Sequence, residues 1–223
     1  MNIDVIDLKK SILEDNDKDA DKLRRELDEK GIFYINLMSA PGSGKTTLLC
    51  ALIKALSKKC RIGVMEADID GDVDAYRVRE AGAESIQLHT DGMCHLDADM
   101  SRQGFKAFNT SAQIVFLENI GNLVCPAEFD TGAHLKVALL ALPEGDDKPL
   151  KYTLMYSTCD MVVITKCDTQ KYFNFDVERC EQHVAKINPQ AEFLTVSAKT
   201  GEGMDALADA IYARYVAWKG ERA

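Results

Sequence analysis

The stretch SAPGSGKTT, Ser39 to Thr47, joins an apolar run to a segment with helical spacing. It matches the phosphate-loop pattern G-x-x-x-x-G-K-[ST] except at the first position, where Ser39 replaces glycine. In such a loop backbone N–H groups bind phosphate oxygens, Lys45 reaches the terminal phosphates, and the Thr46 hydroxyl ligates Mg²⁺. The sequence therefore predicts a nucleotide phosphate site formed by Pro41, Gly42, Ser43, Gly44, Lys45, Thr46 and Thr47.

Short apolar runs alternate with helical patterns on both sides of this loop. Helical spacing marks residues 45–59 and 205–219, and a thin apolar stripe marks the charged segment before Gly31. Alternating strands and helices predict an α/β fold, a mainly parallel sheet with helices on both faces, whose ligands bind beyond the carboxyl ends of the strands. The expected strands are Ile32–Ser39, Arg61–Glu66, Gln113–Glu118, Lys136–Leu142, Met161–Thr165 and Glu192–Ser197.

The amino-acid composition limits the kinds of molecule that the protein is expected to bind. The chain has 223 residues, 46% hydrophobic and 28% charged, which is typical of a globular domain. A net charge of -9 argues against nucleic acid and anionic membranes as partners, and no apolar run has the length that a bilayer requires. No secretory signal is recognisable, so we expect a cytoplasmic protein, and the odd count of seven cysteines favours reduced thiols over a disulfide framework.

A phosphate loop alone is compatible with a kinase, an ATPase or a GTPase. In LENIG a strand ends in Glu118, and Gly121 follows three residues later. This is the spacing of an element that holds Mg²⁺ through water and offers a backbone N–H to the γ-phosphate. We therefore expect catalytic or Mg²⁺-holding roles for Lys45, Glu118 and Gly121, with Thr46 and Glu118 on the metal.

Two later strand ends favour guanine over adenine. ITKCD is a near match to the guanine-reading sequence N-K-x-D, with Thr165 in place of Asn. Asp168 can accept hydrogen bonds from N1–H and the 2-amino group of guanine, while the Lys166 stem covers the base. In VSAKTG the backbone N–H of Ala198 would meet guanine O6, flanked by Ser197 and Lys199. These segments predict a GTPase.

Five longer motifs carry a more specific resemblance: NLMSAPGSGKTTLL, CHLDA, ENIGNLVCPAEFD, EGDDKPLKY and SAKTGEGM. From about residue 8 to its end the chain resembles the HypB family, GTPases that help insert nickel into [NiFe] hydrogenase. The resemblance implies a SIMIBI-type G domain of P-loop NTPases, here residues 31–223 with metal-binding loops, preceded by a helical extension over 1–30. It also implies a homodimer favoured by GTP, which acts with hydrogenase maturation proteins on the large-subunit precursor complex. No histidine-rich or cysteine-rich tract occurs near the N-terminus, where some members have a separate metal store.

Cys94, His95 and Cys125 are candidate ligands for Ni²⁺ or Zn²⁺. Cys94 and His95 lie in a polar loop, and Cys125 follows Gly121 by four residues. Thiolate and imidazole donors suit either ion. The residues alone leave a metal site and two packed cysteines equally open, because a lone cysteine is usually a small buried apolar residue. The family resemblance favours the metal site and implies that two subunits share the metal across the dimer.

The residues that activate water are less clearly marked. Asp68 stands where this group of GTPases keeps an acid near Mg²⁺ and the attacking water, although a surface acid in an acidic loop is the alternative. No arginine finger is obvious, so we expect slow intrinsic turnover. Lys148 and Lys151 resemble family lysines that approach the nucleotide across the dimer.

Two other functions fit the same residues. In one, the protein is a metal carrier in which nucleotide stabilises the fold and hydrolysis is incidental. In the other, it is the related urease-type accessory GTPase, which would not be expected to show CHLDA together with ENIGNLVCP.

Overall fold

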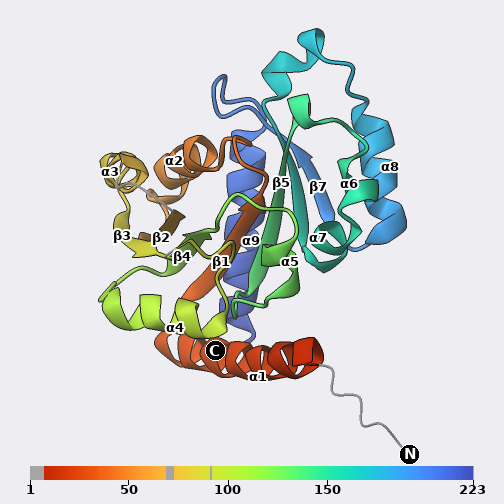
Figure 1. The fold of residues 1–223 in the computed structure, drawn as a ribbon. Coiled ribbons are helices and arrows are strands. Elements are labelled where there is room, and N and C mark those ends of the chain that lie inside the picture. Colours follow the sequence, from red (N-terminus) through yellow and green to blue (C-terminus); the bar gives the residue numbers. More distant parts are fainter. Residues whose placement is uncertain (1–7, 69–72, 91, 223) are drawn as a thin grey trace, which may run out of the picture.

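A seven-stranded parallel sheet forms the centre of the computed structural model (Figure 1). The structure describes residues 8–68, 73–90 and 92–222, with side chains over 12–67, 76–90 and 92–222. The strands run in the order β3-β2-β4-β1-β5-β6-β7, and all neighbours pair in parallel. Their bounds are β1 Phe33–Ser39, β2 Ile62–Asp68, β3 Glu84–His89, β4 Ile114–Glu118, β5 Leu135–Ala141, β6 Met161–Thr165 and β7 Glu192–Thr195.

The observed sheet confirms the α/β prediction. All six expected strands are present, with ends that differ from the expected ones by at most two residues. β3 is an additional strand. Its sequence, ESIQLH, has one buried residue between partly exposed ones, so it lacks the continuous apolar run that identifies the other strands.

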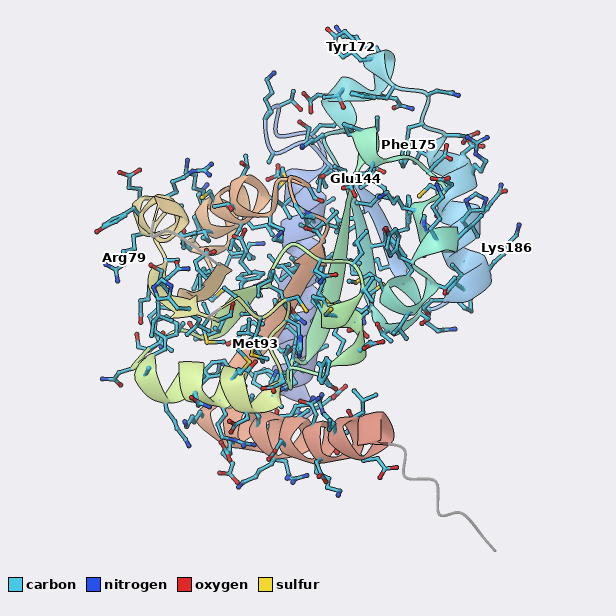
Figure 2. The ribbon with its side chains drawn as sticks, viewed as in Figure 1. Arg79, Met93, Glu144, Tyr172, Phe175 and Lys186 are labelled. Atoms are coloured by element: carbon cyan, nitrogen blue, oxygen red, sulfur yellow. The ribbon has the colours of Figure 1, made fainter. Side chains whose placement is uncertain are left out.

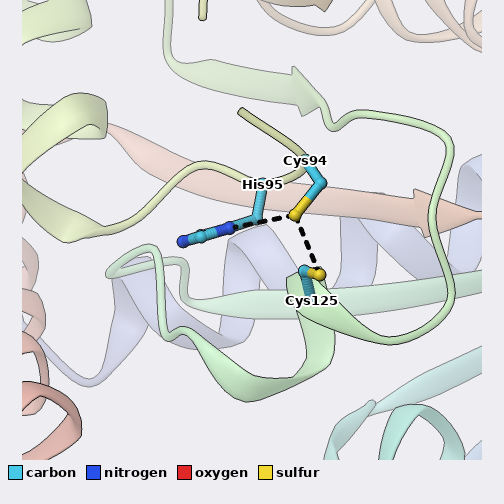
Figure 3. Close-up of side chains that lie close together, drawn as sticks. All are labelled: Cys94, His95 and Cys125. Atoms are coloured by element: carbon cyan, nitrogen blue, oxygen red, sulfur yellow. Dashed lines mark hydrogen bonds between the residues drawn. The ribbon is translucent and has the colours of Figure 1, made fainter. Parts of the chain in front are cut away.

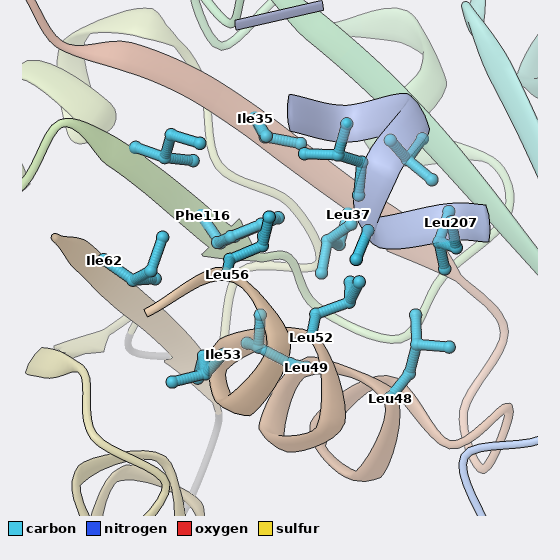
Figure 4. Packing of buried hydrophobic residues seen from close by; sticks show 14 of the residues in the cluster. Ile35, Leu37, Leu48, Leu49, Leu52, Ile53, Leu56, Ile62, Phe116 and Leu207 are labelled. Carbon is cyan, nitrogen blue, oxygen red and sulfur yellow. The ribbon is translucent and has the colours of Figure 1, made fainter. Parts of the chain in front are cut away.

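One face of the sheet packs against α2 (Lys45–Leu56), α3 (Val73–Glu80) and α9 (Met204–Gly220). Alternate residues of β1, including Ile35 and Leu37, point to this face and meet the apolar stripe of α2 (Figure 4). Complete burial of one such leucine or isoleucine contributes about 1.5–3 kcal/mol. The stripe comprises Leu48, Leu49, Leu52, Ile53 and Leu56, each at most 1% exposed. The phosphate loop therefore leads directly into a helix whose apolar stripe is fully buried.

Two groups of helices cover the opposite face. Tyr34 of β1 faces α1 (Leu8–Lys30) and α4 (Ala98–Ala107), and Met38 of the same strand faces α7 (Thr153–Thr158) and α8 (Val177–Ile187). Figure 1 shows the two groups under different halves of the sheet. The shorter helices are α5 (Cys125–Glu128), α6 (Lys148–Lys151), η1 (Leu142–Glu144) and η2 (Cys167–Tyr172).

Helix α1 lies beside α4 at the lower edge of the domain (Figure 1). Ala20, Leu23 and Leu27 are buried on the sheet, whereas Ile12 is 58% exposed. In the described part of the apolar stripe expected before Gly31, burial is therefore complete at its C-terminal end, whereas Leu13 is only partly buried. Within the described ranges, no helix has the length and apolar character that crossing a bilayer requires.

Candidate nucleotide and metal site

The phosphate loop has the backbone shape that its glycines permit. It follows β1 directly, and α2 begins at Lys45. Gly42 and Gly44 have φ values of 75° and 89°, in the left-handed region that favours glycine. The Lys45 ammonium donates a 3.0 Å hydrogen bond to the Ser39 hydroxyl. The serine at the first motif position therefore helps to hold the lysine at the loop.

Ser43, which is completely buried, anchors the loop on two sides. Its hydroxyl lies 2.8 Å from the carbonyl of Ala40 and 2.8 Å from Oε1 of Glu144. On the other side, its carbonyl accepts a 2.8 Å hydrogen bond from the Thr165 hydroxyl. Glu144 also accepts the backbone N–H of Ala141, and Figure 2 labels it near the end of β5. The segment after β5 and the last residue of β6 thus hold the phosphate loop in place.

A cavity of about 600 Å³ opens above the phosphate loop. Two acids from neighbouring strands contribute to its wall, Glu66 of β2 and Glu118 of β4. The Thr46 hydroxyl donates a 2.8 Å hydrogen bond to Oε1 of Glu118, so a hydroxyl and a carboxylate meet where the motif places Mg²⁺. Oxygen donors of this kind suit Mg²⁺. The cavity is lined by Pro41, Gly42, Gly44, Lys45, Thr46, Thr47, Glu66, Ala67, Arg77, Glu118, Asn119, Ile120, Gly121 and Lys166.

The loop after β4 touches the phosphate loop. A Cβ atom placed on Gly121 would lie 2.9 Å from Cα of Pro41, closer than real side chains approach. Behind it, buried Asn119 donates a 3.1 Å hydrogen bond to Oδ1 of Asn36 and accepts the N–H of Ile120 at 2.8 Å. Gly121 is therefore required for close contact, and Asn119 holds the start of the loop to β1.

A smaller cavity of about 240 Å³ lies beside the phosphate loop on the β6 and β7 side. Lys166 has a positive φ of 62°, and its ammonium donates a 2.7 Å hydrogen bond to the carbonyl of Gly42. The Ser197 hydroxyl donates to Oδ1 of Asp168 at 2.7 Å and thereby orients the carboxylate. The structure brings together here the residues predicted to read guanine, Thr165, Lys166, Asp168, Ser197, Ala198 and Lys199.

The three predicted soft donors also converge (Figure 3). One ligand atom from each of Cys94, His95 and Cys125 lies within 4.8 Å of the other two. The two free thiol sulfurs are 2.9 Å apart, and the Cys94 sulfur is 3.7 Å from Nδ1 of His95. Ligand atoms on a tetrahedral ion with bonds of about 2.0–2.3 Å are about 3.3–3.8 Å apart. The donors therefore fit one ion after small side-chain adjustments.

The surroundings of these donors hold the imidazole in place. His95 stacks on Phe129 with ring centroids 4.0 Å apart. Burial lowers the pKa of His95, which favours the neutral, ligating form, whereas the hydrogen bond with Cys125 raises the pKa of the Cys94 thiol. Metal binding would have to displace that thiol proton.

One short segment links the donors to the phosphate cavity. Asn122 donates to the Cys94 carbonyl at 3.3 Å, and its side-chain oxygen accepts the N–H of Val124 at 2.8 Å. Cys125 begins α5 directly afterwards. Asn122 therefore contacts the residues on both sides of this segment, the Cys94 carbonyl and the residue that precedes Cys125.

The structure gives less information about the roles of the remaining predicted residues. Asp68 ends β2, but its side chain, the side chain of Asp74, and residues 69–72 with Asp70 and Asp72 lie outside the described parts. Lys151 pairs with Asp147, and Lys148 lies over the Tyr152 ring. Sequence reasoning missed Glu66 and Glu144. An acid within a buried strand is a usable signal for Glu66, whereas the contact of Glu144 with the loop depends on the tertiary fold.

Comparison with known proteins places the chain in a family. Residues 33–195 match the family model described as CobW/HypB/UreG, nucleotide-binding domain. The chain is 43% identical over 203 residues to the hydrogenase maturation factor HypB of Rhizobium leguminosarum bv. viciae, covering 91% of this chain and 68% of that one. The chain belongs to the HypB family. It is also 37% identical to the probable HypB of Methanocaldococcus jannaschii, covering 94% of this chain and 95% of that one.

Solved HypB structures share the whole fold. HypB from Helicobacter pylori in complex with nickel is 34% identical, with a TM-score of 0.85 over 90% of this chain and 95% of that one. HypB from Archaeoglobus fulgidus is 33% identical, with a TM-score of 0.84 over 90% and 98% of the two chains. The signal recognition particle receptor FtsY from Elizabethkingia anophelis, 13% identical with a TM-score of 0.54 over 78% and 58%, shares the fold alone. The prediction of a P-loop NTPase of the HypB type is confirmed.

Proposed function

We propose that this chain binds and hydrolyses GTP and carries Ni²⁺ as cargo for [NiFe] hydrogenase maturation. The observation that carries the proposal is the position of the soft donors: Cys125 lies four residues beyond Gly121, which contacts the phosphate loop at Pro41. A change at the γ-phosphate can thereby reach a thiol ligand. The nickel in the Helicobacter pylori HypB structure supports the choice of ion for this chain.

In this function the phosphate loop holds the phosphates of GTP, and Asp168 with Ala198 reads guanine. Thr46 and Glu118, with Asp68 at the end of β2, would hold Mg²⁺, which supplies charge compensation at the terminal phosphates when bound. Cys94, His95 and Cys125 would hold Ni²⁺ or Zn²⁺ with one position left for a donor from a second subunit. We therefore propose a cytoplasmic homodimer that forms with GTP, turns over slowly, and meets hydrogenase maturation proteins with the large-subunit precursor.

In the alternative carrier function, the same three residues bind the metal, but the bound nucleotide has no effect on them. This function predicts equal oligomeric state and equal metal affinity with GDP and GTP. The contact between Gly121 and Pro41 argues against a metal site that is independent of the nucleotide. A γ-phosphate bound at the phosphate loop would have to contact the loop around Gly121 or push it away. A urease-type role would differ in its partner protein.

The test is the molar mass of the nickel-loaded protein, measured by light scattering after size exclusion, with GDP and with a non-hydrolysable GTP analogue. We expect a monomer with GDP and a dimer with the analogue. Lys45→Ala is the matched control, because removal of its ammonium should abolish tight nucleotide binding and leave a monomer under both conditions. A mass that does not depend on the nucleotide in wild type supports the carrier function.

A further inference from the structure

Glu66 is a buried acid on a strand that is otherwise apolar before its final residue. β2 reads IGVMEAD, and the Glu66 side chain is only 3% exposed. Residues of β2 alternate between the two faces, so Glu66 shares the face of Val64, which packs in the cluster beneath α2. A carboxylate is strongly disfavoured in such a position unless cations or a bound ligand compensate for its lost hydration. Its position beside the nucleotide cavity is therefore informative.

The neighbours of Glu66 belong to the nucleotide cavity. Glu66 is in register with Glu118 on β4, so the two carboxylates lie at the same level of adjacent strands. Both line the cavity that also contains Lys45 and Arg77. Oε1 of Glu118 accepts the Thr46 hydroxyl and is thereby engaged on the Mg²⁺ side. Glu66 lies one strand farther from the phosphate loop.

The strand order gives the direction in which GTP must lie. The predicted base pocket lies after β6 and β7, the phosphate loop follows β1, and the Mg²⁺-side acid ends β4. A nucleotide that occupies both cavities therefore runs from β6 across β1 toward β4, and its terminal phosphate points toward β2. A water that attacks in line with the bond to be broken must lie beyond that phosphate, on the β2 side. Glu66 lines the cavity on this side.

We propose that Glu66 is a catalytic residue that orients the attacking water and accepts its proton. This inference rests on the GTP hydrolysis proposed above. The water oxygen bonds to the γ-phosphorus, the bond from that phosphorus to the β–γ bridging oxygen breaks, and GDP leaves with the bonding electrons. The water proton passes to the Glu66 carboxylate and then to the released phosphate. Lys45 stays on the opposite, leaving-group side.

Glu66→Gln is the direct test, because the amide keeps the shape of the side chain and cannot accept the proton. Single-turnover hydrolysis of Mg²⁺-GTP should fall by about 100-fold or more. Affinity for Mg²⁺ with a non-hydrolysable GTP analogue should stay within about twofold of wild type. Affinity for GDP with aluminium fluoride, which mimics the phosphoryl group in transfer, should fall by at least about tenfold. Glu80→Gln, an exposed acid on α3, is the matched control and should leave all three unchanged.

If the glutamine variant is unstable, Glu66→Asp can distinguish a loss of hydrolysis from a loss of folding. It should bind the analogue normally and hydrolyse GTP slowly, since its carboxylate is set back by one methylene. A wild-type rate in Glu66→Gln would overturn the inference. So would a loss of analogue or Mg²⁺ binding equal to the loss of rate, which would identify a binding or structural acid. If wild type itself binds no GTP or hydrolyses none, the proposed function fails first.

Discussion

The Thr165 hydroxyl donates a 2.8 Å hydrogen bond to the carbonyl of Ser43, which joins the base-reading segment to the phosphate loop. Both residues are buried. At this position most guanine-reading motifs have asparagine, which has two roles, a hydrogen bond to the base and a tie to the phosphate loop. From sequence, threonine is expected to weaken both, but the observed contact shows that it makes the tie to the loop directly. The departure from the usual motif therefore retains one of the two roles expected of asparagine.

Thr165→Val should weaken both folding and GTP binding, because the isosteric side chain leaves the Ser43 carbonyl without its donor. An unpaired buried group costs about 1–3 kcal/mol, so we expect a loss of roughly fivefold or more in GTP affinity and a lower midpoint of urea unfolding. Thr165→Ser keeps the hydroxyl and is the control. Equal affinities of the valine variant and wild type for a fluorescent GTP analogue would show that the contact does not organise the loop.

Asp168→Asn should change the choice of base. The Ser197 hydroxyl orients the carboxylate at 2.7 Å, and the amide would offer guanine a donor where it needs an acceptor. GTP affinity should fall by about tenfold to one hundredfold, with a relative gain for xanthosine triphosphate. Competition binding measures both, and Asp205→Asn on the exposed start of α9 is the control. If wild type binds ATP as tightly as GTP, the assignment of the base pocket is wrong.

His134 should make folding sensitive to mild acid. Its Nδ1 accepts the N–H of Tyr34 at 2.9 Å, Nε2 lies 3.1 Å from Asp28, and burial lowers its pKa to about 4. The unfolded chain takes up this proton below about pH 6.5, whereas the folded chain resists it down to about pH 4. Stability contributed by neutral His134 is therefore complete above pH 6.5 and declines as pH falls toward 4, by on the order of 3 kcal/mol in total.

Urea unfolding of wild type and His134→Gln between pH 7 and pH 4, with chelator and without nucleotide, measures this contribution. Glutamine cannot titrate but can accept from the Tyr34 amide. We expect the variant to lose less stability than wild type across the window. Parallel pH curves for the two proteins would show that His134 is not the group responsible.

The elements of this fold that can be predicted from sequence are those marked by apolar runs or by an apolar stripe. Five of the predicted strands, β1, β2, β4, β5 and β6, and the stripe of α2 are visible in sequence because they are apolar and buried. The sixth, β7, is only partly buried, and its adjacent apolar residues Phe193 and Leu194 mark it. The edge strand β3 is not visible in sequence, because ESIQLH mixes polar and apolar residues and contains no continuous apolar run. For helix α1, the spacing of apolar residues predicts the helix but not how much of its apolar stripe is buried. Ile12 belongs to the stripe and is exposed.

The residues of the candidate site likewise include some that the sequence predicts and some that it does not. Residues that recur in motifs, such as Lys45 and Asp168, can be named from spacing alone. Glu144 cannot, because its contact with Ser43 joins positions that are 101 residues apart and depends on the path of the chain after β5. Glu66 is a polar residue in an apolar strand, which is a signal in the sequence, whereas the nearby Asp68 matches the family position for an acid.

The central claim is that nucleotide state and nickel affinity are coupled through the loop from Gly121 to Cys125. Isothermal titration of Ni²⁺ into wild type, with GDP and with the non-hydrolysable GTP analogue, tests it most directly. We predict dissociation constants that differ by about fivefold or more, and reciprocity then requires nickel to shift analogue binding relative to GDP by the same factor. Cys125→Ala should weaken nickel binding by more than about tenfold, while Cys50→Ala, a half-buried thiol on α2, should bind like wild type. Equal nickel affinities in the two nucleotide states, or wild-type binding by Cys125→Ala, would contradict the account.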